Sequence, residues 1–594
     1  MRDLKDHISR LLLPHVAQPA QYVGLEVNAC CNPVADADVA VAMAFPDTYS
    51  IGISHLGSQL LYCALNRTPG VACDRVYCPA PDAEDLMRAN GLPLFGWESR
   101  CAVADFDILG FSLAYEMCAT NVLTMLDLAD IPLRSDRRGD EHPIVVAGDA
   151  MADTPEPMAP FVDIFIAGDG EEPLARLVEL VRSMKPARQG RVPRAELLLA
   201  AAKQIPGAYV PAFYESHYDD DGRFAELAPL RDDVPTAIRR VHLAKLSDSP
   251  IIEAPLVPLA EGVHERVIVE VMRGCPNSCR FCQAGHVRLP VRTRPVEEIV
   301  AGVRKALAAT GYREVSLLSL STSDYPQLDE LIDKLSAELT PQHVSISLPS
   351  LRVDSQLRHL PRLTSTVRKA GLTIAAEAGS QRLRAVINKG ITEEDMIAGV
   401  RAAYQAGWNR VKVYFMAGLP GETAADIDAI FDLSRRLARA RREVDGHVGA
   451  ISASVSWAVP KPHTPMQWCA MPPAEYFWQV RGRLRELAAR SPVNFKFHYI
   501  ERSLLEGVLS RGDRRLADVI EAAWRNGARL DSWDEHFDYG HWLAAFEETG
   551  IDPARYIHEP LAADAPLPWS HIKCFRSDEF LRREHGAMMA AAER

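Results

Sequence analysis

Three cysteines stand within eight residues of the sequence VMRGCPNSCRFCQAGH, which covers residues 271–286. They are Cys275, Cys279 and Cys282, in the spacing C-x3-C-x2-C. Thiolate sulfur is the ligand that suits Zn²⁺, Cu⁺ and iron–sulfur clusters. A compact cysteine triplet in a loop after a strand therefore predicts a metal centre.

The number of cysteines distinguishes a structural zinc site from an iron–sulfur cluster. Structural zinc normally takes four protein ligands in a tetrahedron, and His286 is the only nearby residue that could be the fourth. A [4Fe-4S] cluster held by three cysteines instead leaves one iron without a protein ligand, and that iron can bind a small molecule. The triplet favours the cluster over structural zinc.

The cysteines follow the first of a series of strand patterns that alternate with helical stretches. The strand segments are ERVIVEVM, REVSLLSLS, HVSISLPSLR, LTIAAEAGS, NRVKVYFMAGLPGE and GAISASVSWAVPKP. Six strand–helix units predict a partial (β/α)6 barrel over residues 264–464. In such barrels the functional groups gather at the C-terminal ends of the strands.

A second α/β pattern occupies residues 20–185. The apolar runs DVAVAMAFP, DRVYCP, FDILGFSL, PIVVAGD and VDIFIAGD alternate with helical stretches, which predicts a doubly wound, five-stranded parallel sheet. Ligands of such sheets bind beyond the carboxyl ends of the strands. The other regions are predicted to be an N-terminal helix at 1–19, a β-rich connector at 186–263 and a mainly helical domain at 465–594. The fold class is α/β.

The composition limits the class of protein. The chain has 594 residues, of which 47% are hydrophobic, enough for two to four domains with buried cores. Its 66 basic and 79 acidic residues give a formal charge of −13, which disfavours nucleic acid and anionic membranes as partners. No signal peptide and no apolar run of about 20 residues is present. We therefore expect a cytoplasmic protein without a membrane partner.

The triplet, with Phe281 directly before its third cysteine, resembles the signature of the radical SAM superfamily. The segments FPDTYSIGISHLG, AGLPGET, PKPHTPMQW, RGDRR and LPWSHI extend the resemblance to a radical SAM family with an N-terminal cobalamin-binding-like domain and largely unassigned function. The resemblance implies an enzyme whose [4Fe-4S] cluster, held by Cys275, Cys279 and Cys282, binds S-adenosylmethionine and cleaves it reductively to a 5′-deoxyadenosyl radical. It also implies an electron donor such as flavodoxin or ferredoxin.

The resemblance assigns further residues to the site. Those expected to contact S-adenosylmethionine are Phe281, Ser321, Thr322, Ser347, Arg352, Glu377 and Gly418. The segment LSLSTSD, residues 318–324, departs from the Gly-Gly-Glu-like segment that the superfamily usually has there. Candidates for a catalytic role toward the substrate, which stays unknown, are Tyr414, Lys461 and His463.

The sequence does not decide whether the protein binds cobalamin. The usual lower-ligand motif is Asp-x-His-x-x-Gly, and ISHLGS has His55 but Ile53 and Ser58 where Asp and Gly should be. A ligating histidine normally needs an orienting carboxylate, and none stands at that spacing. If cobalamin binds, we expect radical-linked methyl transfer. If it does not, the domain serves packing or substrate recognition.

Two other functions remain as alternatives. One is RNA modification resembling that of the methylthiotransferases, although the N-terminal cysteines lack the matching pattern and the net charge does not indicate the RNA contact that this would need. The other is a non-catalytic sensor or assembly factor that binds the cluster and S-adenosylmethionine.

Overall fold

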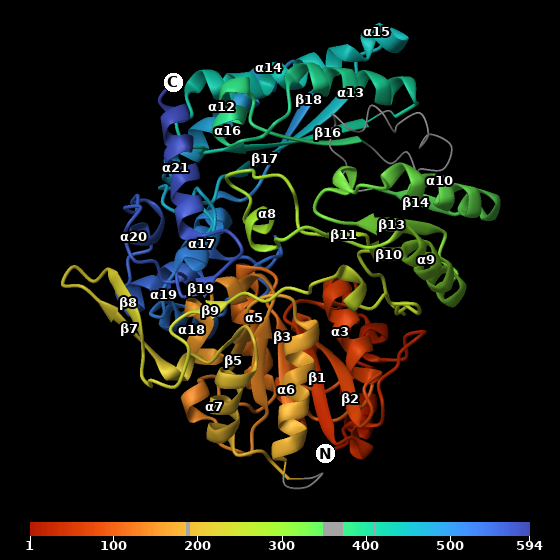
Figure 1. Ribbon diagram of the computed structural model, residues 1–594, viewed down its shortest axis with the longest axis vertical. Helices are drawn as coiled ribbons and strands as arrows, with labels where there is room; N and C mark the ends of the chain where they lie inside the picture. Colours follow the sequence, from red (N-terminus) through yellow and green to blue (C-terminus); the bar gives the residue numbers. More distant parts are fainter. Residues whose placement is uncertain (186–189, 349–371, 409) are drawn as a thin grey trace.

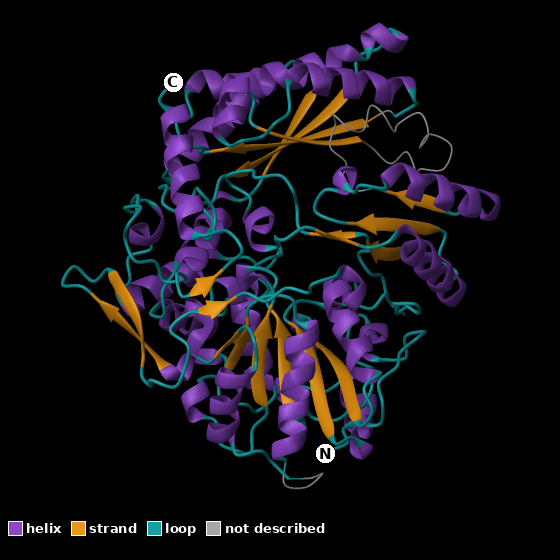
Figure 2. Cartoon of the chain, in the orientation of Figure 1, coloured by secondary structure: helices purple, strands orange, loops and turns teal. Residues whose placement is uncertain are grey.

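The computed structural model describes residues 1–185, 190–348, 372–408 and 410–594. Two α/β halves face each other across the middle of the molecule (Figure 1). The strands of the N-terminal half point with their carboxyl ends toward the other half (Figure 2). The α/β class with parallel sheets, predicted from the alternating apolar runs, is confirmed.

The N-terminal half contains one six-stranded sheet in the order β2-β1-β3-β4-β5-β6. Its strands are β1 (Val39–Phe45), β2 (Val71–Tyr77), β3 (Ile108–Ser112), β4 (Ile144–Gly148), β5 (Ile164–Ile166) and β6 (Ala208–Tyr209). The five predicted strands run parallel, while β6 is antiparallel to β5 and comes from the predicted connector. Every residue of β1, β2 and β3 is buried, as expected for a sheet covered on both faces.

The helices of this half are α3 (Leu56–Asn66), α4 (Pro81–Asn90), α5 (Ala119–Leu128), α6 (Glu171–Met184) and α7 (Arg194–Gln204). The connector, predicted to be β-rich, thus begins with a helix. Its later part is the antiparallel hairpin of β7 (Tyr214–Tyr218) and β8 (Phe224–Pro229), joined through the DDDG turn. The N-terminal helix α1 covers only Lys5–His7, and a short π-helical segment, Ile8–Leu12, follows it.

The second half holds two parallel sheets of described strands. One contains β10 (Val267–Glu270), β13 (Glu314–Leu318) and β14 (Ser345–Ser347); the other contains β15 (Leu372–Glu377), β16 (Arg410–Ala417), β17 (Ala450–Trp457) and β18 (Val493–Phe497). The seventh strand, β18, lies in the stretch predicted to be mainly helical. The prediction missed it because VNFKF is short and half exposed, and only its parallel pairing with β17 makes it a strand.

Helices pack against both of these sheets. They are α9 (Val296–Thr310), α10 (Leu328–Leu339), α12 (Gln381–Val386), α13 (Glu393–Gln405), α14 (Ala424–Ala440) and α16 (Ala474–Ala488). The C-terminal region adds α17 (Ile500–Arg511), α18 (Leu516–Arg525), α19 (Tyr539–Thr549), α20 (Ala554–Ile557) and α21 (Asp578–Ala592). In the described part of the chain no helix is long and apolar enough to cross a membrane.

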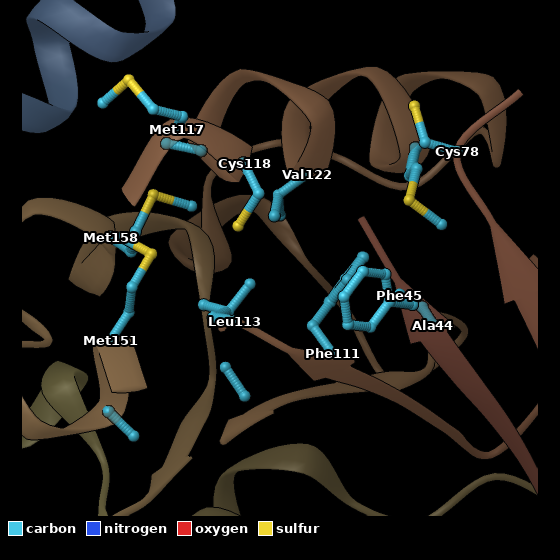
Figure 3. Close-up of a cluster of buried hydrophobic side chains, with 14 of the residues drawn as sticks. Ala44, Phe45, Cys78, Phe111, Leu113, Met117, Cys118, Val122, Met151 and Met158 are labelled. Atoms are coloured by element: carbon cyan, nitrogen blue, oxygen red, sulfur yellow. The ribbon is translucent and has the colours of Figure 1, made fainter. Parts of the chain in front are cut away.

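One continuous apolar core joins the N-terminal half to the β15–β18 sheet and the C-terminal helices. Figure 3 shows a part of this core, in which Phe45 of β1 lies beside Phe111 of β3 and Cys118 lies beside Val122. Helix α18 packs against α5. The β10–β13–β14 sheet has a separate core with α9 and α10. The two sheets of the second half are therefore packed in separate cores.

The two halves also meet at His571, which precedes β19 (Ile572–Lys573), the strand paired with β9 (Ile238–Arg239). Its ring packs 4.6 Å from that of Tyr209 and lies 3.8 Å from Glu156 Oε1. Burial lowers the pKa of His571 to about 4; Glu156 opposes this shift, and Arg514 and His463 add to it. The imidazole is therefore neutral in the folded protein.

This lowered pKa predicts a stability change at mildly acidic pH. The unfolded chain binds a proton at this histidine below its ordinary pKa of about 6.5, whereas the folded chain does not until about pH 4. The free energy of unfolding should fall by about 2 kcal/mol from this group between about pH 7 and about pH 5. Urea unfolding of wild type and His571→Gln measures it, and an equal pH slope in both would contradict the assignment.

Candidate functional site

The cysteine loop lies between two short antiparallel strands, β11 (Met272–Arg273) and β12 (Arg292–Thr293), and contains helix α8 (Gln283–Val287). Gly274 begins the loop with φ of +86°. A Cβ there would lie 2.8 Å from Pro290 O and 2.9 Å from Arg288 O. Only glycine fits this close approach, so the turn that brings Cys275 off the strand is set by the backbone.

The three thiols are half-buried and near one another. Cys282 caps α8, with its sulfur 3.4 Å from the amide of Gly285. Burial raises the pKa of the Cys282 thiol to about 11, and the charges of Cys279, Cys275 and Glu377 add to the shift. Glu377, from the end of β15, is thus close enough to the loop to act on it electrostatically.

The donor set suits a cluster better than structural zinc. Across the described ranges, no three His, Cys, Asp or Glu side chains are placed to hold a single metal ion. A zinc ion needs such convergence, whereas each cysteine of a [4Fe-4S] cube binds a different iron. His286, the one nearby zinc candidate, is buried with Nε2 3.2 Å from the carbonyl oxygen of Cys279, which makes that nitrogen a donor.

Asp324 ties the cysteine loop to the end of β13. Its Oδ2 accepts hydrogen bonds from Ser321 Oγ at 2.6 Å and from Asn277 Nδ2 at 2.7 Å. Asn277 Nδ2 also lies 3.5 Å from the sulfur of Cys275. The structure therefore places Ser321 beside the loop through a carboxylate that the sequence did not single out. Asp324 is the last residue of the LSLSTSD segment. Its position in that segment was the sequence signal that could have identified it as a residue of the site.

Glu377 has a left-handed backbone conformation, with φ of +66°, at a bulge in the pairing of β15 with β16. This conformation costs a residue with a side chain roughly 1 kcal/mol. Its carboxylate is only 15% exposed and lies 3.2 Å from Lys389 Nζ. Glu377 is therefore a strained, half-buried carboxylate near the cysteine loop, with Lys389 as its ion-pair partner.

The remaining residues expected at S-adenosylmethionine are placed differently. Phe281 packs in an apolar cluster with Leu383, Val386 and Leu419. Thr322 is fully buried and its hydroxyl bonds to Ser319, so it does not face a ligand. Ser347 is half-buried on β14, and Arg352 lies outside the described residues.

Gly418 has φ of +93°, and a Cβ there would meet the ring of Phe477 at 2.8 Å. The need for glycine at this position is therefore explained by packing within the protein. Nothing in this contact requires an adenine ring beside Gly418.

Two of the catalytic candidates connect the halves of the molecule. Lys461 Nζ lies 2.6 Å from Glu116 Oε1 and 2.8 Å from Glu506 Oε1. Burial alone would lower the pKa of Lys461, but the two carboxylates raise it above its usual range. His463 is buried, with Nε2 2.7 Å from Asp153 O. Both side chains have structural partners.

Tyr414, the third candidate, is half-buried on β16. Lys412 Nζ stands 5.2 Å from the centroid of its ring. The alternation of β16 places Tyr414 and Lys412 on one face of the strand, with the buried Val413 and Phe415 on the other. Tyr414 therefore lies on the more exposed face of β16, opposite the residues that pack in the core.

A cavity of about 650 Å³, here called the central cavity, separates the carboxyl ends of β1, β3, β4 and β5 from the strands β10 and β13. Its volume lies in the usual range of small-molecule sites. It extends along Met272, Arg273 and Gly274 to the start of the cysteine loop. Its lining combines apolar side chains and glycines with charged side chains. The first group includes Met43, Gly57, Leu60, Leu61, Gly110, Phe111, Gly148, Ile166, Gly170, Leu174, Ile268 and Leu318, and the second includes Asp149, Asp169, Glu171, Arg266, Glu270, Arg273 and Arg288.

His55 lies in the wall of the central cavity at the N-terminus of α3. Its Nδ1 accepts a hydrogen bond from Ser58 N at 3.2 Å, so the proton is on Nε2, which lies 3.6 Å from Asp149 Oδ2. Asp149 pairs in turn with Arg288 at 2.5 Å. Burial lowers the pKa of His55; Asp149 opposes the shift and Arg288 adds to it. The carboxylate that the sequence did not show is Asp149, which directly follows β4, and it faces the ring nitrogen that does not cap α3.

The C-terminal helix α21 covers the cysteine loop, which sequence reasoning did not predict. Glu584 lies 3.2 Å from an Nη of Arg280, and Arg576, just before the helix, donates to Ser278 Oγ at 3.2 Å. Helix α21 also packs against α12 (Figure 1). The GAMMAAAER end of α21 consists mostly of small residues and has little hydrophobic pattern, so the sequence did not indicate that this helix covers the cysteine loop.

The fold and the cysteine loop define an α/β protein with a thiolate site at the strand ends of a parallel sheet. Residues 57–211 match the family model described as radical SAM proteins, N-terminal, and residues 269–434 match the radical SAM superfamily model. The chain therefore belongs to the radical SAM superfamily of enzymes. The superfamily predicted from the cysteine spacing is confirmed.

Three similar proteins illustrate the range of the match. An uncharacterized protein of Methanocaldococcus jannaschii is 24% identical over 86% of this chain and 97% of its own. The tRNA-2-methylthio-N(6)-dimethylallyladenosine synthase of Carboxydothermus hydrogenoformans is 29% identical over 32% of this chain and 44% of its own. The structure of the radical S-adenosylmethionine methyltransferase TsrM from Kitasatospora setae, with cobalamin and [4Fe-4S] cluster bound, aligns with a TM-score of 0.49 and 13% identity over 93% of this chain and 99% of its own.

Proposed function

We propose that this radical SAM enzyme holds a [4Fe-4S] cluster on Cys275, Cys279 and Cys282 and binds cobalamin in the central cavity. The observation that carries the proposal is the loop of three half-buried thiols, which begins at Gly274 in the wall of that cavity. When bound, the cluster and S-adenosylmethionine supply a 5′-deoxyadenosyl radical, and cobalamin supplies a carrier of methyl groups. We place the enzyme in the cytoplasm, with flavodoxin or ferredoxin as the class of electron donor.

The residues of the chain orient these groups and exclude water. Ser321, together with Asn277 and Asp324, fixes the loop side of the site. Glu377 is held by Lys389 and can accept hydrogen bonds from hydroxyl or amino groups of S-adenosylmethionine. Apolar side chains of the central cavity, such as Phe111 and Ile166, could pack against the face of a corrin ring, and its polar side chains, such as Arg273, could bind the amide groups at the ring edge. The shared cavity would bring both cofactors to one substrate.

Anaerobic reconstitution tests the cluster assignment. Protein loaded with iron and sulfide, reduced with dithionite and given S-adenosylmethionine should release 5′-deoxyadenosine and methionine, or S-adenosylhomocysteine if a methyl group is transferred. Absence of every cleavage product from fully loaded protein would contradict the enzymatic function. Protein expressed with cobalamin should in addition show the absorbance of the corrin.

Cobalamin binding should not depend on His55. Because its Nδ1 caps α3 and its Nε2 faces Asp149, we expect His55→Ala to keep cobalamin affinity and the cobalamin spectrum while losing about 1 kcal/mol of folding free energy through the cap. Absorbance after gel filtration and urea unfolding measure the two effects. A spectral change specific to His55→Ala would show that the imidazole is the lower ligand after all.

The methylthiotransferase alternative lacks a supporting arrangement in the N-terminal half. Cysteines 63, 73, 78, 101 and 118 are buried, and Cys30 and Cys31 are adjacent in sequence, so these seven residues lack the spacing of a three-cysteine ligand loop. The match to the tRNA-modifying synthase covers about a third of this chain, at 32%. We therefore do not propose RNA as the substrate.

A further inference from the structure

A second cavity, of about 420 Å³, lies between the β7–β8 hairpin and the C-terminal helices. We call it the arginine cavity. None of the residues that line it lines the central cavity. Its apolar wall contains Phe224, Ile551, Leu561 and Leu567, and its volume suits a small molecule. It is therefore a candidate site separate from the radical chemistry.

Arg511, the last residue of α17, lies in the wall of the arginine cavity and is 2% exposed. Its Nη1 donates to Cys469 O at 2.8 Å, whereas Nε and Nη2 have no hydrogen-bond partner. No carboxylate in the described part of the chain lies within ion-pair distance of it. A buried guanidinium without a counter-ion is costly, so the charge of Arg511 is unbalanced by the protein itself.

Two further guanidinium groups converge at the hairpin turn. A Cβ at Gly222 would lie 3.7 Å from Arg515 Nη1 and also 3.7 Å from Arg555 Nη1. Arg515 uses Nε and Nη2 for Asp513, and Arg555 uses Nη2 for Asp221 O. Both Nη1 atoms therefore lie beside the hairpin turn, where one anion could accept hydrogen bonds from each of them.

The carboxylates around the cavity have other partners. Asp513 accepts from Arg515, Tyr556 and Tyr218, with donor distances of 2.7 to 3.4 Å. Asp219 accepts from the backbone amides of Asp221 and Arg223, and Asp552 accepts from Ala554 N. The site is therefore not a broad basic patch. It offers the buried charge of Arg511, the exposed charge of Arg555, which among the described residues bonds only to a carbonyl oxygen, and Nη1 of Arg515 and of Arg555 beside an apolar wall.

We propose that the arginine cavity binds a small organic anion with an apolar body and a carboxylate or phosphate head group. Arg511 balances the charge from the wall, and Nη1 of Arg515 and of Arg555 bind the head-group oxygens. Guanidinium groups match the geometry of both head groups. This site lies apart from the cluster and the cobalamin cavity, so it stands independently of the proposed function.

Isothermal titration calorimetry on the full, reconstituted chain tests the proposal with phenyl phosphate, benzoate and neutral benzyl alcohol. At least one anion should bind and the alcohol should not, and the two anions distinguish the head groups. Arg511→Met should weaken anion binding by at least about tenfold. Arg304→Met is the control, because Arg304 pairs with Glu338 on the exposed surface of α9.

A second variant keeps the proposal testable if Arg511→Met does not fold. Arg555 is exposed at the rim, so Arg555→Gln should fold normally and still weaken binding by about fivefold. Circular dichroism establishes that each variant is folded. Failure of both anions to bind, binding of the alcohol as tightly as the anions, or full anion affinity in the folded variants would overturn the proposal.

Discussion

Cys279→Ala should lose its iron–sulfur cluster and all cleavage of S-adenosylmethionine. Three cysteines hold the proposed cube, so removal of one thiol leaves it with only two protein ligands. Two thiolates leave two irons open to solvent, so the cluster is expected to break down. Iron per chain should fall from about four to near zero, and 5′-deoxyadenosine should fall to background.

Cys30→Ser is the matched control, because Cys30 is an exposed cysteine of the N-terminal half. Iron and sulfide content, the absorbance of the cluster and chromatography of the nucleoside products are compared after anaerobic reconstitution. Full iron content in a variant lacking Cys275, Cys279 and Cys282 together would show that the cluster is held elsewhere.

Gly148→Leu should abolish cobalamin binding while the cluster and its reduction remain. Gly148 ends β4 in the wall of the central cavity, and a Cβ there would have one neighbour within 4 Å, Ile166 O at 3.9 Å. Its φ is not positive, so the backbone accepts a side chain. A leucine would project into space that the corrin needs, and cobalamin occupancy should fall by at least about tenfold.

Gly148→Ala is the control, since one methyl group fits the open space and should preserve most of the binding. Corrin absorbance, iron content and circular dichroism are measured on the same samples. Wild-type cobalamin affinity in a folded Gly148→Leu protein would place cobalamin outside the central cavity, while leaving the cluster assignment intact.

The sequence alone was sufficient for the local features. Val- and Ile-rich runs such as VAVAMAF are buried on both faces, and such runs have few stable alternatives to a parallel sheet. The cysteine spacing also acts locally, because Cys275 to Cys282 share one loop whose shape depends on Gly274 and its neighbours. These properties follow from side-chain type and short-range sterics.

Features that depend on distant segments were not predictable in this way. Strand β18 is half exposed and needs β17 beside it. Asp149 meets His55 and Arg288 from loops far apart in the chain, and Lys461 meets Glu116 and Glu506 across the two halves. The sequence does not show which carboxylate a basic residue will pair with, because many carboxylates along the chain could form the ion pair.

The sequence by itself determined the class of fold and the loop of three thiols, because burial patterns and cysteine spacing act over a few residues. The tertiary structure decided what surrounds that loop. It placed Glu377 near the thiols, opened the central cavity beside them, and turned His55 toward Asp149. It also left Arg511 buried without a counter-ion. Each of these follows from the packing of segments whose meeting depends on the whole fold.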